Sequence, residues 1–214
     1  MRVENPQRHE PPRLSSPETA RLPDDTLRPT GLEEPDGAAA TEELPMSSLS
    51  VYHVSSPEIP NKVLTHFEDI ASTLAEQGVR FDRWQAAAKI QPGASQEDMI
   101  AAYQAPIDKL MTERGYLSVD VVSLNSDDPQ TTELRATFLE EHRHGEDAVL
   151  FFVAGRGLFS LHIDDYVYAV LCEKNDLIIV PAGTKYWFDM GEHPHFITIR
   201  LCKSPEGLEA NFTG

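Results

Sequence analysis

This sequence of 214 residues has little cysteine, fewer basic than acidic residues and no long apolar run. Its two cysteines, Cys172 and Cys202, are too few for a disulfide scaffold and too far apart for a zinc knuckle. With 18 basic against 35 acidic residues the net charge is −17, which disfavours nucleic acid and anionic membrane surfaces as partners. No apolar run approaches the roughly 18–20 residues of a membrane helix, and the first residues lack the apolar core of a signal peptide. We therefore expect a cytoplasmic protein with reduced thiols.

Residues 1–45 differ in composition from the rest of the chain. They hold eight of the sixteen prolines, no Phe, Trp or Tyr, and five arginines against ten acidic residues. Such a segment cannot bury enough apolar surface to offset the entropy lost on ordering. We predict a disordered acidic, proline-rich extension over residues 1–45 and a folded domain over residues 46–214. An interaction tail is the alternative interpretation of the extension.

The first half of the expected domain mixes helical and strand patterns. Apolar residues recur at helical spacing over Lys62–Gln77, and Gly78 supplies a stop signal. A second helix is expected to begin at Ser95 and end at Gly115, with Pro106 kinking or splitting it. The other expected elements are strands over Val51–Val54, Val79–Trp84 and Leu117–Leu124 and a short helix or turn over Thr132–Leu139.

The second half, from residue 142 onwards, consists of short apolar or alternating runs separated by turn signals. Strands at this spacing are typical of an antiparallel sandwich or barrel. The runs are Val149–Val153, Leu158–Ile163, Tyr166–Cys172, Leu177–Val180, Lys185–Phe188 and Phe196–Leu201. The sequence therefore predicts an α+β fold dominated by β structure, in which helices and short strands precede and cover a barrel.

The triplet His142-Arg143-His144 is the most informative chemical pattern. Residues two apart in a strand project from the same face, and two adjacent imidazoles inside a barrel suit a divalent transition metal. Taken alone the pair is a weak signal, because two surface histidines beside acidic residues give the same pattern. Gly155 and the turn Pro181-Ala182-Gly183 strengthen it, since they are placed to return strands to the barrel.

Together these motifs resemble the cupin double-stranded β-helix and, within it, the acireductone dioxygenase family. The resemblance runs from about Met46 to Gly214 in several separate segments. These are Phe81-Asp82-Arg83-Trp84, Phe138–Asp147, Pro181–Thr184, Trp187–Gly191, Pro205–Gly207 and Ala210–Gly214. It implies a single cupin barrel and an Fe²⁺-dependent dioxygenase of methionine salvage, which cleaves acireductone with dioxygen to formate and 4-methylthio-2-oxobutanoate. With Ni²⁺ the family catalyses an off-pathway cleavage that also yields carbon monoxide.

The family binds its metal through three His and one Glu, and this sequence matches half of that set. By the resemblance, His142 and His144 are the first two ligands, whereas Ala148 replaces the Glu and Tyr186 replaces the third His. Leu150 replaces a basic residue suited to an anionic substrate. Positions 142, 144, 148 and 150 are expected to face one side of a strand. The changes would then fall on the face that binds metal and substrate.

Three residues are candidates to replace the missing ligands. Glu146 is expected to project from the same strand face as position 148, but it lies two residues before that position. Asp147 is expected to project from the opposite face, so it could reach the site only if a bulge intervenes. Tyr186 could bind the metal as a phenolate, although its reference pKa of about 10 means that the phenol normally keeps its proton at neutral pH. Its alternative role is to fill the barrel as an aromatic side chain. The resemblance also places Phe138, Phe188 and Arg200 near the substrate. Their alternative roles are core packing for the aromatics and a surface salt bridge for the arginine.

These observations imply a member of the acireductone dioxygenase family whose activity is impaired by an incomplete ligand set. One alternative is a non-catalytic cupin, or pseudoenzyme, that binds a small anion or a protein partner. Another is an active enzyme with an unusual ligand set, which would use acireductone and dioxygen. We expect a monomer in each case.

Overall fold

The computed structural model describes residues 46–91, 93–127, 129, 131–204 and 206–213. The extension predicted over residues 1–45 lies outside the described residues and stays a prediction, as does a domain boundary at residue 46. Within the described part, no helix is long and apolar enough to cross a membrane.

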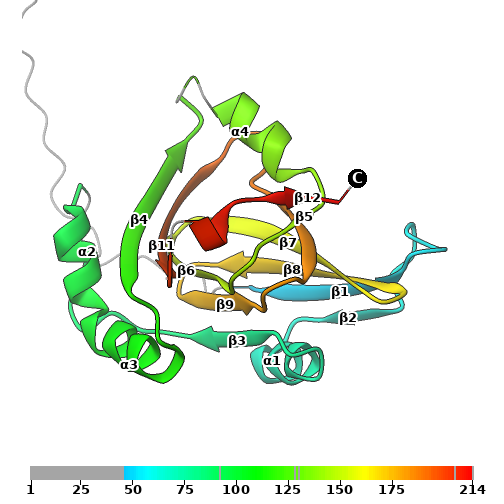
Figure 1. The fold of residues 1–214 in the computed structure, drawn as a ribbon, viewed down its shortest axis with the longest axis horizontal. Coiled ribbons are helices and arrows are strands. Elements are labelled where there is room, and N and C mark those ends of the chain that lie inside the picture. Colours follow the sequence, from blue (N-terminus) through cyan, green and yellow to red (C-terminus); the bar gives the residue numbers. More distant parts are fainter. Residues whose placement is uncertain (1–45, 92, 128, 130, 205, 214) are drawn as a thin grey trace, which may run out of the picture. The chain divides into compact units, whose positions relative to one another are not determined.

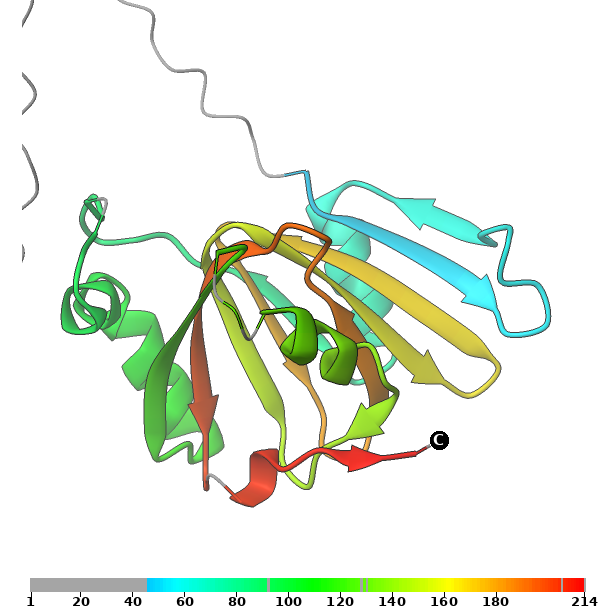
Figure 2. The same cartoon turned by 90° about the horizontal axis from the view of Figure 1, so that it is seen from above.

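Two antiparallel sheets face each other and enclose the core (Figures 1 and 2). The larger sheet has the strand order β12-β5-β10-β7-β8-β1-β2, and the smaller has the order β3-β9-β6-β11-β4. The strands of the larger sheet are β1 (Ser48–His53), β2 (Lys62–Leu64), β5 (His142–Arg143), β7 (Arg156–Ile163), β8 (Tyr166–Glu173), β10 (Lys185–Asp189) and β12 (Asn211–Phe212). Those of the smaller sheet are β3 (Arg80–Arg83), β4 (Ser118–Asn125), β6 (Ala148–Ala154), β9 (Asp176–Val180) and β11 (His195–Cys202).

Within the described residues, four α-helices cover the sheets: α1 (Phe67–Ala75), α2 (Gln96–Ala102), α3 (Gln104–Arg114) and α4 (Thr131–Phe138). Helices α2 and α3 pack on the outer face of the smaller sheet, which explains the apolar run of β9 (Figure 1). Ile178 of β9 belongs to the core between the sheets, whereas Leu177 and Ile179 belong to the cluster under α2 and α3. Every residue of β9 is buried as a result. The predicted α+β fold dominated by β structure is confirmed.

The helix expected over Lys62–Gln77 is wrong in its first part. Lys62–Leu64 forms β2 and pairs with β1, and α1 begins only at Phe67 after the extended residue His66. Val63 is 57% exposed, so the apolar periodicity that included it does not describe one buried face. Pairing with the neighbouring strand β1 outweighed the helical pattern at these residues.

The helix expected from Ser95 to Gly115 is split, but not at its proline. Ser95 caps α2 by accepting a hydrogen bond from the Asp98 amide at 3.1 Å, and Gly115 ends α3 with a left-handed φ of 71°. The break falls at Tyr103. Pro106 therefore lies in the first turn of α3, where its missing N–H leaves no intrahelical hydrogen bond unmade.

Candidate functional site

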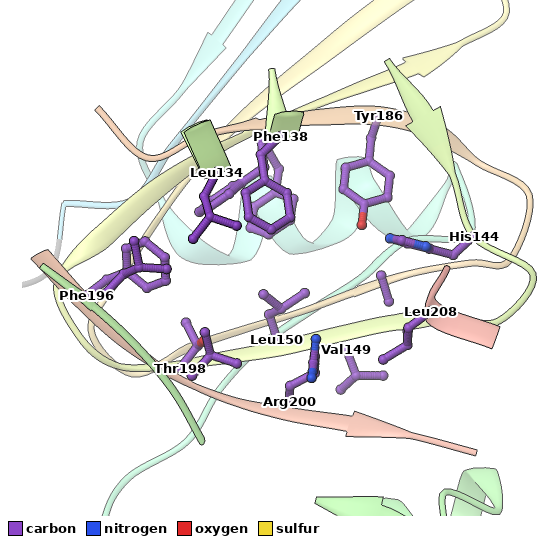
Figure 3. Close-up of a pocket in the computed structure, with 15 residues that line it drawn as sticks. Leu134, Phe138, His144, Val149, Leu150, Tyr186, Phe196, Thr198, Arg200 and Leu208 are labelled. Atoms are coloured by element: carbon purple, nitrogen blue, oxygen red, sulfur yellow. The ribbon is translucent and has the colours of Figure 1, made fainter. Parts of the chain in front are cut away.

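A cavity of about 220 Å³ lies between the two sheets, with α4 along one side (Figure 3). All but four of its lining residues are apolar. The lining consists of Val122, Leu124, Leu134, Phe138, His144, Ala148, Val149, Leu150, Phe159, Tyr186, Phe188, Phe196, Thr198, Arg200 and Leu208. Any chemistry at this site therefore depends on a few polar groups in an apolar enclosure.

The two histidines lie together near this cavity, with ring centroids 5.2 Å apart. Nδ1 of His142 lies 2.7 Å from the Glu140 carbonyl oxygen, and Nδ1 of His144 lies 3.1 Å from that of Glu209. A carbonyl oxygen only accepts, so each Nδ1 carries a proton and each Nε2 of a neutral ring keeps a free lone pair. Burial lowers the pKa of His144, which favours that neutral form. Both imidazoles thus have the tautomer that metal-binding histidines use.

Tyr186 of β10 pairs directly with His142 of β5, and its ring centroid lies 4.6 Å from that of His142. Its hydroxyl points towards His144 at the edge of the cavity (Figure 3). Burial raises the pKa of this phenol far above its usual range, so the group stays protonated at neutral pH. A protonated phenol is a hydrogen-bond donor and a poor metal ligand.

The expectation that positions 142, 144, 148 and 150 share one strand is wrong. Strand β5 ends at Arg143, and Ala148 and Leu150 lie on β6 of the opposite sheet. His144, Ala148 and Leu150 nevertheless line the same cavity, because the two sheets face each other across it. Positions 148 and 150, where the resemblance predicts substitutions, therefore do lie on the cavity wall.

The two acidic residues proposed as replacement ligands are engaged elsewhere. Glu146 accepts hydrogen bonds from the Ser204 hydroxyl and from the amides of Lys203 and Ser204. Asp147 accepts from the Tyr116 hydroxyl at 3.0 Å and from the Ala182 amide at 3.1 Å. Neither carboxylate lines the cavity. They fasten the connection between β5 and β6 to neighbouring loops instead.

The donor set therefore does not fit the metal that the family resemblance implies. The rings of His142 and His144 lie with centroids 5.2 Å apart, Ala148 offers no donor atom, and Tyr186 is held protonated. Among the residues that the structure describes, no group of three His, Cys, Asp or Glu side chains is arranged to hold a metal ion. Without a carboxylate the site also lacks the negative charge that would balance a dication.

The three residues expected to bind substrate all line the cavity, but Arg200 is already paired. Its Nη2 lies 2.6 Å and its Nε 3.1 Å from the carboxylate oxygens of Asp120 on β4, a two-point ion pair. The Phe138 and Phe188 rings meet edge to face, with centroids 6.3 Å apart. These two rings form part of the wall between α4 and β10; Phe188 belongs to the buried core, and the partly buried Phe138 packs against that core.

Sequence reasoning missed the role of two segments that complete the cavity. Helix α4 contributes Leu134 and Phe138 to the wall, and the segment after β11 contributes Leu208 (Figure 3). It also missed Thr198, a fully buried polar residue of β11 that lines the cavity. The one available signal was a polar residue inside the apolar run Phe196–Leu201.

An ion pair between Arg135 of α4 and Asp189 of β10, at 3.1 Å, fastens α4 beside the cavity. Burial tends to raise the pKa of Asp189, but hydrogen bonds from Arg135 and Gly191 outweigh it and lower the pKa overall. The pKa of the Asp189 carboxyl is therefore lower in the folded than in the unfolded state. The ion pair stabilises the fold at pH values above the unfolded-state pKa, and this stabilisation disappears as the pH falls through the folded-state pKa.

We expect Arg135→Gln to lower the free energy of unfolding at neutral pH by less than about 1 kcal/mol, because both side chains are partly exposed. The difference from the native protein should shrink in acid. Urea unfolding between about pH 3 and pH 7 measures it, with Lys109→Gln, in an exposed pair, as the matched control. A difference that stays constant with pH would show that Arg135 acts by packing alone.

A model described as the ARD/ARD′ family matches residues 51–210. Acireductone dioxygenase of Pseudomonas fluorescens strain Pf0-1 is 85% identical over 169 residues, which cover 79% of this chain and 93% of that protein. Acireductone dioxygenase of Pseudomonas aeruginosa strain PAO1 is 70% identical over the same shares. Among solved structures, acireductone dioxygenase from Bacillus anthracis with a cadmium ion in its active center matches with a TM-score of 0.68 and 25% identity. The match covers 78% of this chain and 98% of that one, which confirms the predicted cupin barrel.

Proposed function

Because this chain belongs to the acireductone dioxygenase (ARD/ARD′) family, we propose that its ancestral reaction is the oxidative cleavage of acireductone by dioxygen in methionine salvage. We propose further that this chain performs the reaction poorly. Fe²⁺ is the metal proposed for the ancestral reaction, with Ni²⁺ as the alternative, since both would use one ligand set. The substrate would be a small molecule.

The donor set of the cavity carries this proposal. His142 and His144 present two free Nε2 lone pairs, while the positions of the other two ligands hold Ala148 and a protonated Tyr186. Two imidazoles without a carboxylate make a weak, exchangeable site. Leu150 and the Asp120-paired Arg200 leave the cavity without a free charge of its own to hold an anionic substrate.

Anaerobic calorimetric titration of metal-stripped protein with iron(II) tests this proposal. We expect weak binding that does not reach a stoichiometric plateau, and oxygen consumption with acireductone close to the background rate. Tight binding of one iron per chain would contradict the proposal. In that case Tyr186 would be the first residue to examine, because Glu146 and Asp147 are held by other partners.

A second candidate function is that of a non-catalytic cupin that binds a small molecule. The observation in its favour is the cavity itself, which stays open at about 220 Å³ although two ligand positions are changed. The Phe138 and Phe188 rings, which form one side of the cavity, pack edge to face against each other. We also propose a cytoplasmic monomer that binds neither nucleic acid nor membrane, in keeping with the net charge of −17.

A further inference from the structure

We propose that the barrel cavity binds an uncharged, ring-sized molecule carrying a hydroxyl group, and that the Thr198 hydroxyl recognises that group. This inference rests on the second function proposed above, a cupin that binds a small molecule, and names the chemistry of the ligand.

The Thr198 hydroxyl is the observation that points to a polar ligand. Thr198 is 0% exposed, and its Oγ1 is the one buried side-chain oxygen or nitrogen atom of the described residues that lacks a hydrogen-bond partner. The residue lines the cavity (Figure 3) and lies at an irregularity where the register of β11 with β6 shifts between Ile197 and Thr198. A buried hydroxyl without a partner destabilises the fold. Because Oγ1 itself is covered in this structure, the side chain has to turn its hydroxyl into the cavity to meet a ligand. A ligand that then supplies the missing hydrogen bond would remove that penalty.

A second polar end lies across the cavity. The Tyr186 hydroxyl can donate, and the His144 Nε2 can accept because Nδ1 donates to the Glu209 carbonyl. In Figure 3 these two groups lie on the side of the cavity opposite Phe196 and Thr198, with Leu150 between the two ends. The site therefore offers polar contacts at two ends and apolar contact in its middle, as small-molecule sites usually do.

The charge balance favours an uncharged ligand. Arg200 is the one charged residue of the lining, and two of its donors already bind Asp120. An anion would have to compete with this carboxylate, whose bond to Arg200 Nη2 measures 2.6 Å. Ala148 and Leu150 add no charge to the wall. The apolar surroundings also make it costly to bring an unpaired charge into the cavity.

Size and shape limit the ligand to about one ring. An apolar protein cavity of roughly 150 Å³ takes up benzene, so about 220 Å³ leaves room for a six-membered ring and a short substituent. Aromatic side chains surround this space, and the Phe188 and Phe196 rings meet at 88° with centroids 5.8 Å apart. Rings in edge-to-face arrangements accept another ring favourably.

The test compares three probes of similar size: benzyl alcohol, toluene and benzoate. Calorimetry or ligand-observed NMR with metal-stripped protein should show one benzyl alcohol bound per chain, several-fold weaker toluene binding and the weakest binding for benzoate. Thr198→Val should remove the advantage of benzyl alcohol over toluene, roughly three- to tenfold, which is the worth of one buried hydrogen bond. Toluene binding should stay the same or improve. Tightest binding by benzoate would overturn the proposal, since it would mean that the site reads an anion.

Two further variants make the result decisive. Thr73→Val removes a half-buried hydroxyl on α1, away from the cavity lining, and should leave all three affinities unchanged. Ala148→Leu fills the cavity and should abolish binding of all three probes. Thr198→Val should unfold at the same or higher urea concentration, because it removes an unpartnered hydroxyl. Equal loss of benzyl alcohol and toluene binding in a folded Thr198→Val protein would overturn the role of the hydroxyl, and probe binding that survives Ala148→Leu would overturn the location.

Titration of the same preparation with iron(II) separates this inference from the proposal of impaired metal chemistry. Weak iron binding together with no benzyl alcohol binding would overturn the ligand class alone. Tight iron binding would overturn the impaired-metal proposal, and the ligand inference would then be decided by the Thr198→Val comparison.

Discussion

The double substitution Ala148→Glu with Tyr186→His is expected to create a stoichiometric iron(II) site. Both positions line the cavity beside His144, and His142 pairs directly with position 186. The change would add one carboxylate and one imidazole to two histidines whose Nε2 atoms are already free. We expect affinity to rise by more than about 100-fold, since even the loss of an outer-shell partner costs roughly 10–100-fold in metal affinity. Anaerobic calorimetry against the native protein measures the gain.

The metal-free double variant is expected to be less stable than the native protein. It buries a carboxylate in an apolar wall and replaces the large ring of Tyr186, which is 5% exposed. Iron(II) should then raise its thermal midpoint but not that of the native protein, because binding to the folded state adds stability. Adding Leu150→Arg to the double variant should improve affinity for an anionic substrate.

The matched control is Ala148→Gln with Tyr186→Phe, which keeps similar volumes but supplies neither a carboxylate nor an imidazole. It should bind iron no better than the native protein. A double variant that folds, as judged by circular dichroism, yet takes up no iron would show that positions 148 and 186 are not the ligand positions that the resemblance assigns.

The second large effect is expected for Gly155→Ala, at the turn between β6 and β7. Gly155 has φ of +75°, and a Cβ there would lie 2.0 Å from the His195 carbonyl oxygen and 2.7 Å from the Phe196 Cα. These contacts are with the backbone of β11, which neighbouring pairings fix in place. We expect a loss of at least about 3 kcal/mol in the free energy of unfolding, from left-handed strain together with a displaced strand. Urea unfolding followed by circular dichroism measures it.

Gly183→Ala is the control that isolates the close approach. Gly183 has a similar φ of +81°, but nothing lies within 4 Å of the added Cβ. Only the left-handed strain remains, at about 1–2 kcal/mol. Equal losses in the two variants would refute the role of the β11 contact and leave the backbone angle as the whole effect.

The strands of the second half were predictable because their patterns are local. Each run of alternating or apolar residues after position 148 became a strand within a few residues of its expected bounds. The Lys62–Leu64 segment failed for the opposite reason. Its helical spacing was equally local, but the pairing of Leu49 with Leu64 across the β1–β2 turn decided its conformation.

The candidate site was predictable in part. The sequence places His142 and His144 two residues apart, and this spacing brings their rings within 5.2 Å. It does not reveal that Ala148 lies on the opposite sheet, because the turn before β6 changes the direction of the chain. Nor does it reveal that Asp120 forms an ion pair with Arg200, since the two residues lie 80 positions apart in the sequence.

By itself, then, the sequence determined the family and the succession of strands and predicted an incomplete set of metal donors, because each follows from residue type and spacing along the chain. Only the tertiary structure decided which polar side chains near the cavity find hydrogen-bond partners. Glu146 and Asp147 turn to other partners, and the hydroxyl of Thr198 is left without one. Such outcomes depend on which distant groups come within hydrogen-bonding distance once the two sheets face each other, and no local pattern specifies that.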